Sequence, residues 1–188
     1  MAQEIAFESD VTGAQSRAKG SDSRLNTSSR TDSRRYYNSR DRGQAYSLPF
    51  LFNTSASTEY AAYLKNTSTD KTMVVSAIGL NSEVATRWLL EEVTGIAAGG
   101  DAVTPKNLNF ASPNDAAATG MEGASAATGI TGLTPVGAPV DSAWSVATGH
   151  EELRLDDTLR LGQNDAIALQ CLETAGGDVA GIIFFYYE

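Results

Sequence analysis

The chain has 188 residues, of which 41% are hydrophobic, and 14 Lys and Arg stand against 23 Asp and Glu for a formal net charge of −9. This length predicts one domain with an appendage. Cys171 and His150 are the only residues of their kinds, which excludes an intramolecular disulfide, multi-cysteine zinc sites and histidine-cluster metal sites. No apolar run is long enough for a membrane span, and the polar N-terminus does not resemble a signal peptide.

Charge is divided unevenly along the chain. Residues 1–48 hold eight Lys or Arg and six Asp or Glu, a balance of +2, whereas residues 49–188 hold six and seventeen, a balance of −11. Between Arg17 and Arg42 the count is eight to three, or +5. The sequence therefore predicts a basic N-terminal arm attached to an acidic body.

Residues 1–45 show neither helical periodicity nor strand alternation, and we expect them to form an extended arm. Their Ser, Arg, Asp and Asn content does not provide a core. Fixing each residue costs on the order of 1–2 kcal/mol of backbone entropy, so an ordered arm needs contacts with other chains. The candidate partner-binding residues of the arm are Arg24, Arg30, Arg34, Arg35, Tyr36, Tyr37, Arg40 and Arg42.

Three interpretations of this arm are open. Arginine pairs bidentately with carboxylates, which favours docking along acidic protein surfaces, with Tyr36, Tyr37 and Tyr46 filling shallow pockets there. Arginine also pairs with phosphate and tyrosine stacks on bases, as in nucleic-acid binding. The interspersed Asp22, Asp32 and Asp41 would repel phosphate, so we expect protein docking and no nucleic acid. Packing against its own domain or against symmetry mates is the third interpretation.

The body, residues 46–188, alternates apolar and polar residues in a series of predicted strands. The segments 59–67 and 72–80 flank a short polar turn and are predicted to pair as a hairpin. Segment 86–96 also fits a short helix, but its Trp88 and Val93 favour a strand. About eight strands and no clear helix predict an all-β chain, an antiparallel β-sandwich of the jelly-roll type. The predicted strands are 46–54, 59–67, 72–80, 86–96, 102–112, 150–157, 158–164, 165–173 and 179–188.

Two segments indicate contacts between subunits. Residues 111–149 are rich in Ala, Gly, Thr, Ser and Pro and are predicted to form a long excursion of short strands packed against something flat. The last strand, 179–188, is apolar on both faces, whereas a strand buried on one face alternates. We therefore expect Ile182, Phe184 and Tyr186 to lie in a subunit interface.

Candidate catalytic groups are few. His150 stands beside Glu151 and Glu152, but neighbouring strand residues point to opposite faces, so a solvated strand end is expected rather than a site. A weak calcium site is the alternative, although the spacing fits no EF-hand loop. Cys171 alternates with buried apolar residues and is expected to pack in the core. We predict no catalytic residue, no metal and no cofactor, and a protein that is not an enzyme.

Four segments of the body resemble the strand–turn pieces of small jelly-roll structural proteins of tailed bacteriophage virions. They are YLKNTSTDKTMVVSAIGL (63–80), TPKNLNFASPNDA (104–116), LRLGQNDAIALQ (159–170) and GGDVAGIIFFYYE (176–188). The resemblance covers residues 46–188 and supplies no catalytic residue. It implies a non-enzymatic homo-oligomer, often a trimer, that is made in the host cytoplasm and built into the virion as a decoration or cement protein, a spike or a fibre component.

Together these observations predict a capsid decoration or cement protein. The arm would anchor it to neighbouring subunits, to the major capsid protein or to other virion proteins. The alternative is a receptor-binding module at a tail or fibre tip, whose 111–149 loops recognise a glycan through an exposed Trp144.

Overall fold

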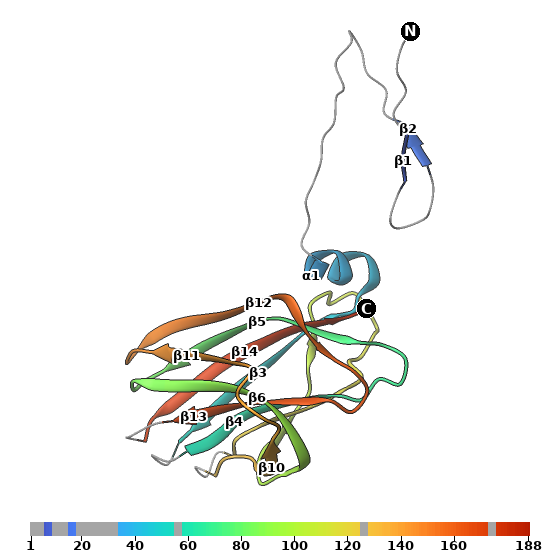
Figure 1. Ribbon diagram of the computed structural model, residues 1–188. Helices are drawn as coiled ribbons and strands as arrows, with labels where there is room; N and C mark the ends of the chain where they lie inside the picture. Colours follow the sequence, from blue (N-terminus) through green and yellow to red (C-terminus); the bar gives the residue numbers. More distant parts are fainter. Residues whose placement is uncertain (1–5, 9–14, 18–33, 55–57, 125–127, 173–175) are drawn as a thin grey trace. The chain divides into compact units, whose positions relative to one another are not determined.

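The computed structural model describes residues 6–8, 15–17, 34–54, 58–124, 128–172 and 176–188 (Figure 1). The chain divides into two compact units, Met1–Ser33 and Arg34–Glu188. The described part of the first unit is an antiparallel pair of short strands, β1 (Ala6–Glu8) and β2 (Gln15–Arg17).

The second unit is a β-sandwich that begins with one short helical segment. This segment is one turn of α-helix, α1 (Arg34–Tyr37), continued by the π-helical η1 (Asn38–Arg42). The strands of the unit are β3 (Ala45–Asn53), β4 (Thr58–Asn66), β5 (Met73–Ser82), β6 (Thr86–Ala98), β7 (Asp101–Val103), β8 (Lys106–Asn107), β9 (Ala118–Glu122), β10 (Thr131–Pro135), β11 (Asp141–Ser145), β12 (Gly149–Leu161), β13 (Ala166–Leu172) and β14 (Asp178–Tyr187).

Two antiparallel sheets make up the sandwich. One has the order β12-β5-β14-β3-β8; the other has the order β10-β6-β13-β4-β9-β7, with β11 also paired to β6. Along the chain, β3, β5, β12 and β14 fall in the first sheet, and β4, β6, β11 and β13 in the second. This alternation is the arrangement of a jelly roll, a double sheet of eight principal strands. The predicted all-β jelly-roll sandwich is confirmed.

The predicted hairpin of residues 59–67 and 72–80 is wrong. β4 pairs with β13 and β9, whereas β5 pairs with β12 and β14 in the opposite sheet. The intervening turn carries the chain across the sandwich. Buried Asn66 holds this crossing, because its side-chain amide donates to the carbonyls of Lys71 at 3.0 Å and Leu161 at 2.9 Å.

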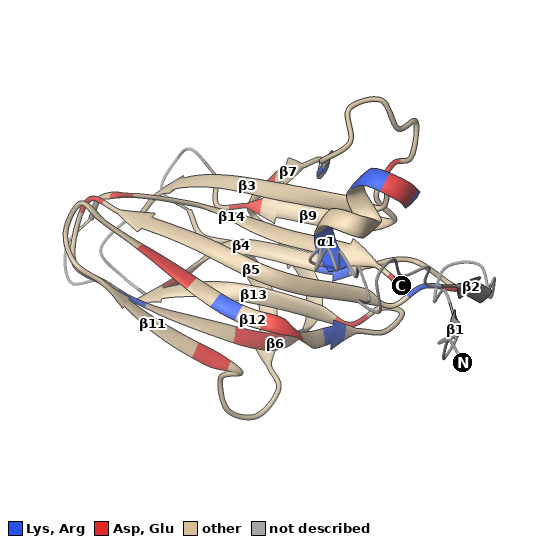
Figure 2. Cartoon of the chain, turned by 90° about the horizontal axis from the view of Figure 1, so that it is seen from above, with Lys and Arg blue, Asp and Glu red and all other residues tan. Residues whose placement is uncertain are grey.

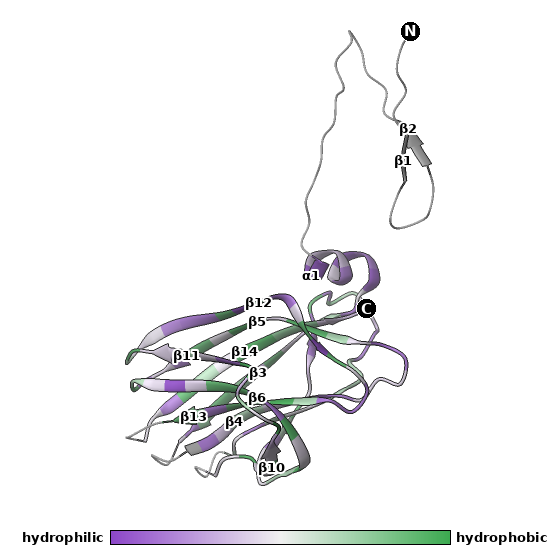
Figure 3. Ribbon diagram, in the orientation of Figure 1, coloured by the Kyte–Doolittle hydropathy of each residue, from purple (hydrophilic) through white to green (hydrophobic). Residues whose placement is uncertain are grey.

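The main core lies between the two sheets, where hydropathy is highest along β3, β5 and β14 (Figure 3). Trp88 is fully buried, meets Phe50 edge-on at 6.2 Å and donates its indole N–H to Ser145 Oγ at 3.1 Å. Cys171 is also fully buried, as predicted. Each fully buried Leu, Ile or Phe side chain of this core contributes roughly 1.5–3 kcal/mol by leaving water.

A smaller core covers part of the outer face of the second sheet. Tyr63, Val93 and Ala168 form it with Ile130, whose backbone N–H donates to the Tyr60 carbonyl at 2.9 Å. The 111–149 stretch does carry short strands, β9, β10 and β11, and they join the chain's own sheet. A role of this stretch between subunits stays a prediction.

The two strands predicted over 150–164 are one strand, β12. Its pairing with β5 shifts register between Arg154 and Leu159. Asp156 and Asp157 lie there with left-handed φ angles of 44° and 59°. The predicted break between these two strands is therefore a bulge, which bends a strand without ending it.

Candidate partner-binding site

The predicted arm residues are now divided between two regions. Arg24 and Arg30 lie outside the described residues. The other six lie in α1 and η1, so the prediction of an extended arm is wrong for residues 34–42. Gly43 ends this helical segment in the left-handed conformation, at φ 58°, which suits glycine. Its N–H and that of Gln44 donate to the Ser39 and Asn38 carbonyls at 3.2 and 2.9 Å.

A loop far along the chain secures the end of the helical segment. The Gly43 carbonyl accepts hydrogen bonds from Asn107 Nδ2 at 2.8 Å, Asn114 Nδ2 at 3.3 Å and Ser112 Oγ at 3.3 Å. A Cβ at Gly43 would collide with Ser112. The loop presents Phe110 to solvent, 93% exposed. A helix this short is marginal alone, so these long-range bonds hold it in place.

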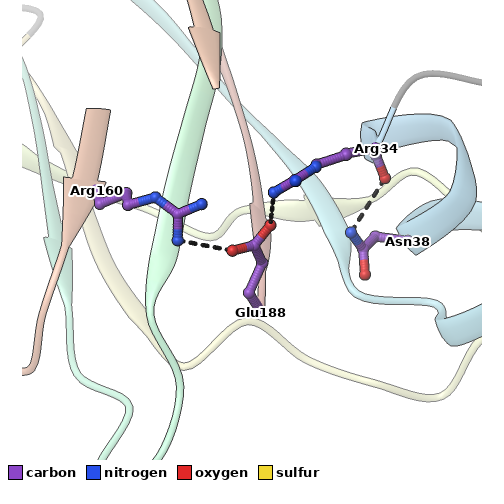
Figure 4. A network of polar contacts seen from close by, with 4 residues as sticks. All are labelled: Arg34, Asn38, Arg160 and Glu188. Carbon is purple, nitrogen blue, oxygen red and sulfur yellow. Dashed lines mark hydrogen bonds and ion pairs between the residues drawn. The ribbon is translucent and has the colours of Figure 1, made fainter. Parts of the chain in front are cut away.

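Glu188 joins the helical segment to the sheets (Figure 4). One carboxylate oxygen accepts from Arg34 Nη1 at 2.8 Å, and the other accepts from Arg160 Nη1 at 2.7 Å. Asn38 Nδ2 donates to the Arg34 carbonyl at 3.0 Å. Partial burial tends to raise the Glu188 pKa, but the guanidinium hydrogen bonds from Arg160 and Arg34 outweigh it, and the pKa lies below its ordinary value.

The helical segment lies over one end of the outer face of the five-stranded sheet (Figure 1). The Arg35 guanidinium sits 4.5 Å from the centre of the Phe184 ring. Tyr186 is 0% exposed and packs with Ala45 and Val74, and burial raises its pKa to about 12. The prediction that Tyr186 lies in a subunit interface is therefore corrected, because its own chain already covers it.

The remaining arginines of the segment contact neighbouring side chains. Arg40 donates to both carboxylate oxygens of Asp41, at 2.6 and 2.7 Å, and these bonds lower the Asp41 pKa. The guanidinium carbons of Arg40 and Arg42 lie 5.2 and 5.4 Å from the ring centres of Tyr36 and Tyr37. The segment is thus a preordered cluster of cations and aromatic rings, and its docking to neighbours stays a prediction.

Tyr46 does not belong to this cluster. Its ring is buried in the main core and stacks on Phe185 at 5.5 Å. Its hydroxyl donates to the Asp115 carbonyl at 3.2 Å and so holds the loop after Phe110 against the sandwich. The expectation that Tyr46 fills a pocket on a neighbour is wrong, because this residue begins a core-facing row of β3.

The outer face of the five-stranded sheet carries apolar residues beyond those predicted from the sequence. Leu51 is 62% exposed and Pro49 is exposed. They pair with Ala180 and Ile182 of β14, so the four residues lie together. Ile182 and Phe184 of the predicted interface are half-buried on this face. The apolar residues on both faces of 46–54 are a signal of this surface that was available in the sequence.

The residues considered as catalytic or metal-binding candidates do not lie together in the structure. His150 is exposed and its Nδ1 lies 3.1 Å from Asn81 Oδ1, while Glu152 pairs with Arg154 at 2.9 Å. Buried Cys171 donates its thiol to the Glu59 carbonyl at 3.2 Å. Over the described ranges, no three His, Cys, Asp or Glu side chains gather in a way that would hold a metal ion. No helix of this part of the chain has the length and apolar character to cross a bilayer.

Two further features bear on binding. Trp144 on β11 is 62% exposed and lies directly across from Arg87 on β6. A pocket of about 320 Å³ opens between the loop after Phe110 and the crossing turn of β4 and β5. Its lining residues are Gln44, Tyr46, Ser68, Asp70, Lys71, Pro113, Asn114, Asp115, Ala117 and Tyr187.

Comparison of the chain with protein-family models, with curated proteins and with solved structures finds no match.

Proposed function

We propose that this protein is a non-enzymatic structural component of a phage virion, of the capsid decoration or cement type. One observation carries the proposal: α1 and η1 hold a cluster of arginines and tyrosines in a fixed position on the surface of an otherwise acidic body. Beside the cluster lies the exposed apolar face around Leu51. The resemblance of residues 46–188 to virion proteins supports the assignment to a phage virion.

A binding segment that is already ordered before it binds favours such a role. A flexible arm loses conformational entropy when it binds, whereas a segment tied by Glu188 and by the Gly43 carbonyl has already lost much of it. Arginine keeps N–H donors for carboxylates even when its plane lies over an aromatic ring, as Arg35 and Arg42 do. The cluster therefore suits binding to acidic surfaces of other virion proteins or of further copies of the chain.

The test is incorporation into particles. Phage particles are purified by density gradient from hosts that produce a tagged wild-type chain or a variant with Arg34, Arg35, Arg40 and Arg42 changed to Gln. We expect the wild type to sediment with the particles and the variant to stay in the soluble fraction. A control changes four cations of the body, Lys65, Lys71, Arg87 and Lys106, to Gln. Absence of the wild-type chain from particles would refute the proposal, as would equal loss of both variants.

A second candidate is glycan recognition at a tail or fibre tip, and the exposure of Trp144 favours it. Its indole lies on the outer face of the second sheet in register with Arg87; Ser142 lies two residues before it on β11, and Gln170 lies on β13, on the other side of β6. Aromatic faces stack on sugar rings, and such polar groups bind hydroxyls. Glycan-array binding that is lost in Trp144→Ala and kept in Val146→Ala would establish this function in place of the first.

A further inference from the structure

The apolar stripe on the outer face of the five-stranded sheet lacks a cover among the described residues. It runs along β3 and β14 through Pro49, Leu51, Ala180 and Ile182, which are paired across the two strands. At one end it meets Phe184 under the Arg35 guanidinium. A contiguous exposed apolar surface on a sheet marks an interaction site more often than a free surface.

The two ends of this face differ in charge. The helical segment at one end has four arginines and one aspartate, a balance of +3. At the other end is a groove of about 270 Å³ with two exposed carboxylates, Glu83 and Asp178. Asn81 and Ala180 line the groove and oppose each other on the outer face, so the groove continues the stripe. In Figure 2 the basic helical segment lies at one end of the sheets.

We infer that a second copy of this chain docks face to face on this sheet, about a two-fold axis that runs across the strands. This orientation places the helical segment of each copy over the acidic groove of the other. The two apolar stripes then meet at the centre. The contact is isologous, because the same surface serves both partners. The inference rests on the proposed assembly role and deepens it by naming the partner.

Size and charge both fit this occupant. With about 4.8 Å between strands and about 3.4 Å per residue, the four long strands of 9–13 residues span roughly 700 Å². A standard stable interface buries roughly 800 Å² per partner. A parallel stacking of the two sheets would bring arginines against arginines, so electrostatic complementarity selects the antiparallel one.

The test uses two charge-reversal variants of the full chain. The segment variant is Arg35→Glu with Arg42→Glu, and the groove variant is Glu83→Arg with Asp178→Arg. Sedimentation equilibrium over a dilution series measures the mass of each. We expect the wild type to dimerise and each variant alone to dimerise at least about tenfold more weakly. Mixing the two should restore a dimer, because both contacts of a mixed pair join opposite charges.

Several results would overturn the inference. These are a wild-type monomer, a wild-type trimer, variants that dimerise like the wild type, or a mixture that does not pair. Reversal of Lys65 and Arg87 to Glu, on the other sheet, is the matched control. If circular dichroism shows that a variant does not fold, Leu51→Glu provides the second measurement, since it places two charges at the centre of the contact and must weaken the dimer.

The outcome is separable from that of the proposed function. A two-fold dimer in solution that never enters particles keeps the pairing and refutes the virion role. A chain that enters particles but is monomeric or trimeric in solution keeps the virion role and refutes the pairing.

Discussion

Two neighbouring tyrosines differ in a way that predicts opposite effects of the same substitution. Tyr187 is buried at the end of β14, and its hydroxyl is buried without a hydrogen-bond partner in the part of the chain that the structure describes. Tyr46 meets it edge-on at 5.7 Å and is equally buried, but its hydroxyl donates to the Asp115 carbonyl. Replacement of each by Phe removes one oxygen from the same part of the core.

The expected magnitudes follow from the hydrogen bonds. Burial of a hydroxyl without a partner costs about 1–3 kcal/mol in mutational data. Tyr187→Phe should therefore raise the free energy of unfolding by about 1 kcal/mol. Tyr46→Phe removes a hydrogen bond that the folded chain makes, so it should lower the free energy of unfolding by about 0.5–1.5 kcal/mol. In a domain of this size 1 kcal/mol corresponds to about 2–4 °C in Tm.

Urea titration and calorimetry of the two variants measure this difference. Burial raises the pKa of both phenols, so the hydroxyls stay protonated at neutral pH and charge does not complicate the comparison. A Tyr187→Phe variant less stable than the wild type by 1 kcal/mol or more would refute the reasoning. It would mean that the Tyr187 hydroxyl has a partner, such as a buried water.

Two further predictions concern the attachment of the helical segment. Glu188→Gln should lower the free energy of unfolding at pH 7 by about 0.5–1 kcal/mol, because its ion pairs are partly exposed. The folded-state pKa of Glu188 is lowered, so this stabilisation is present above its ordinary value of 4.5 and is lost as pH falls through the folded pKa. The difference in urea midpoint between the wild type and Glu188→Gln should therefore be present at pH 7 and should shrink as the pH is lowered through the folded pKa. Gly43→Ala should cost more than about 1 kcal/mol, because it adds backbone strain and a collision with Ser112. Gly137→Ala has a similar φ in open space and should cost less; equal melting temperatures for the two would contradict this.

Strand positions were predictable from local pattern because alternation reports which face is buried. On β13, Ile167, Leu169 and Cys171 stand at alternate positions, and all three face the main core. Which strands pair with each other was harder to predict from the sequence. The turn between β4 and β5 looks like a hairpin turn in sequence, and its function as a crossing depends on Asn66 reaching Leu161, 95 residues away.

The candidate site was predictable in composition and not in conformation. The arginines and tyrosines were identified, but nothing in residues 34–42 repeats with a helical period. The segment is helical because Asn107, 64 residues away, binds the Gly43 carbonyl and because Glu188, 154 residues away, pairs with Arg34. Contacts at such separations leave no local signature, so a short segment that depends on them has the appearance of a disordered one.

The edges of the five-stranded sheet bear on the proposed pairing of two copies of the chain. An unpaired edge strand invites strand addition, which proteins hinder with charges, bulges, proline and short edge strands. β12 carries charged residues along its length and bends at Asp156 and Asp157. At the other edge, β8 pairs with two residues of β3, and Pro49 further along has no N–H to offer. Since both edges resist strand addition, the proposed pairing is expected to use the face around Leu51 and the helical segment rather than a sheet edge.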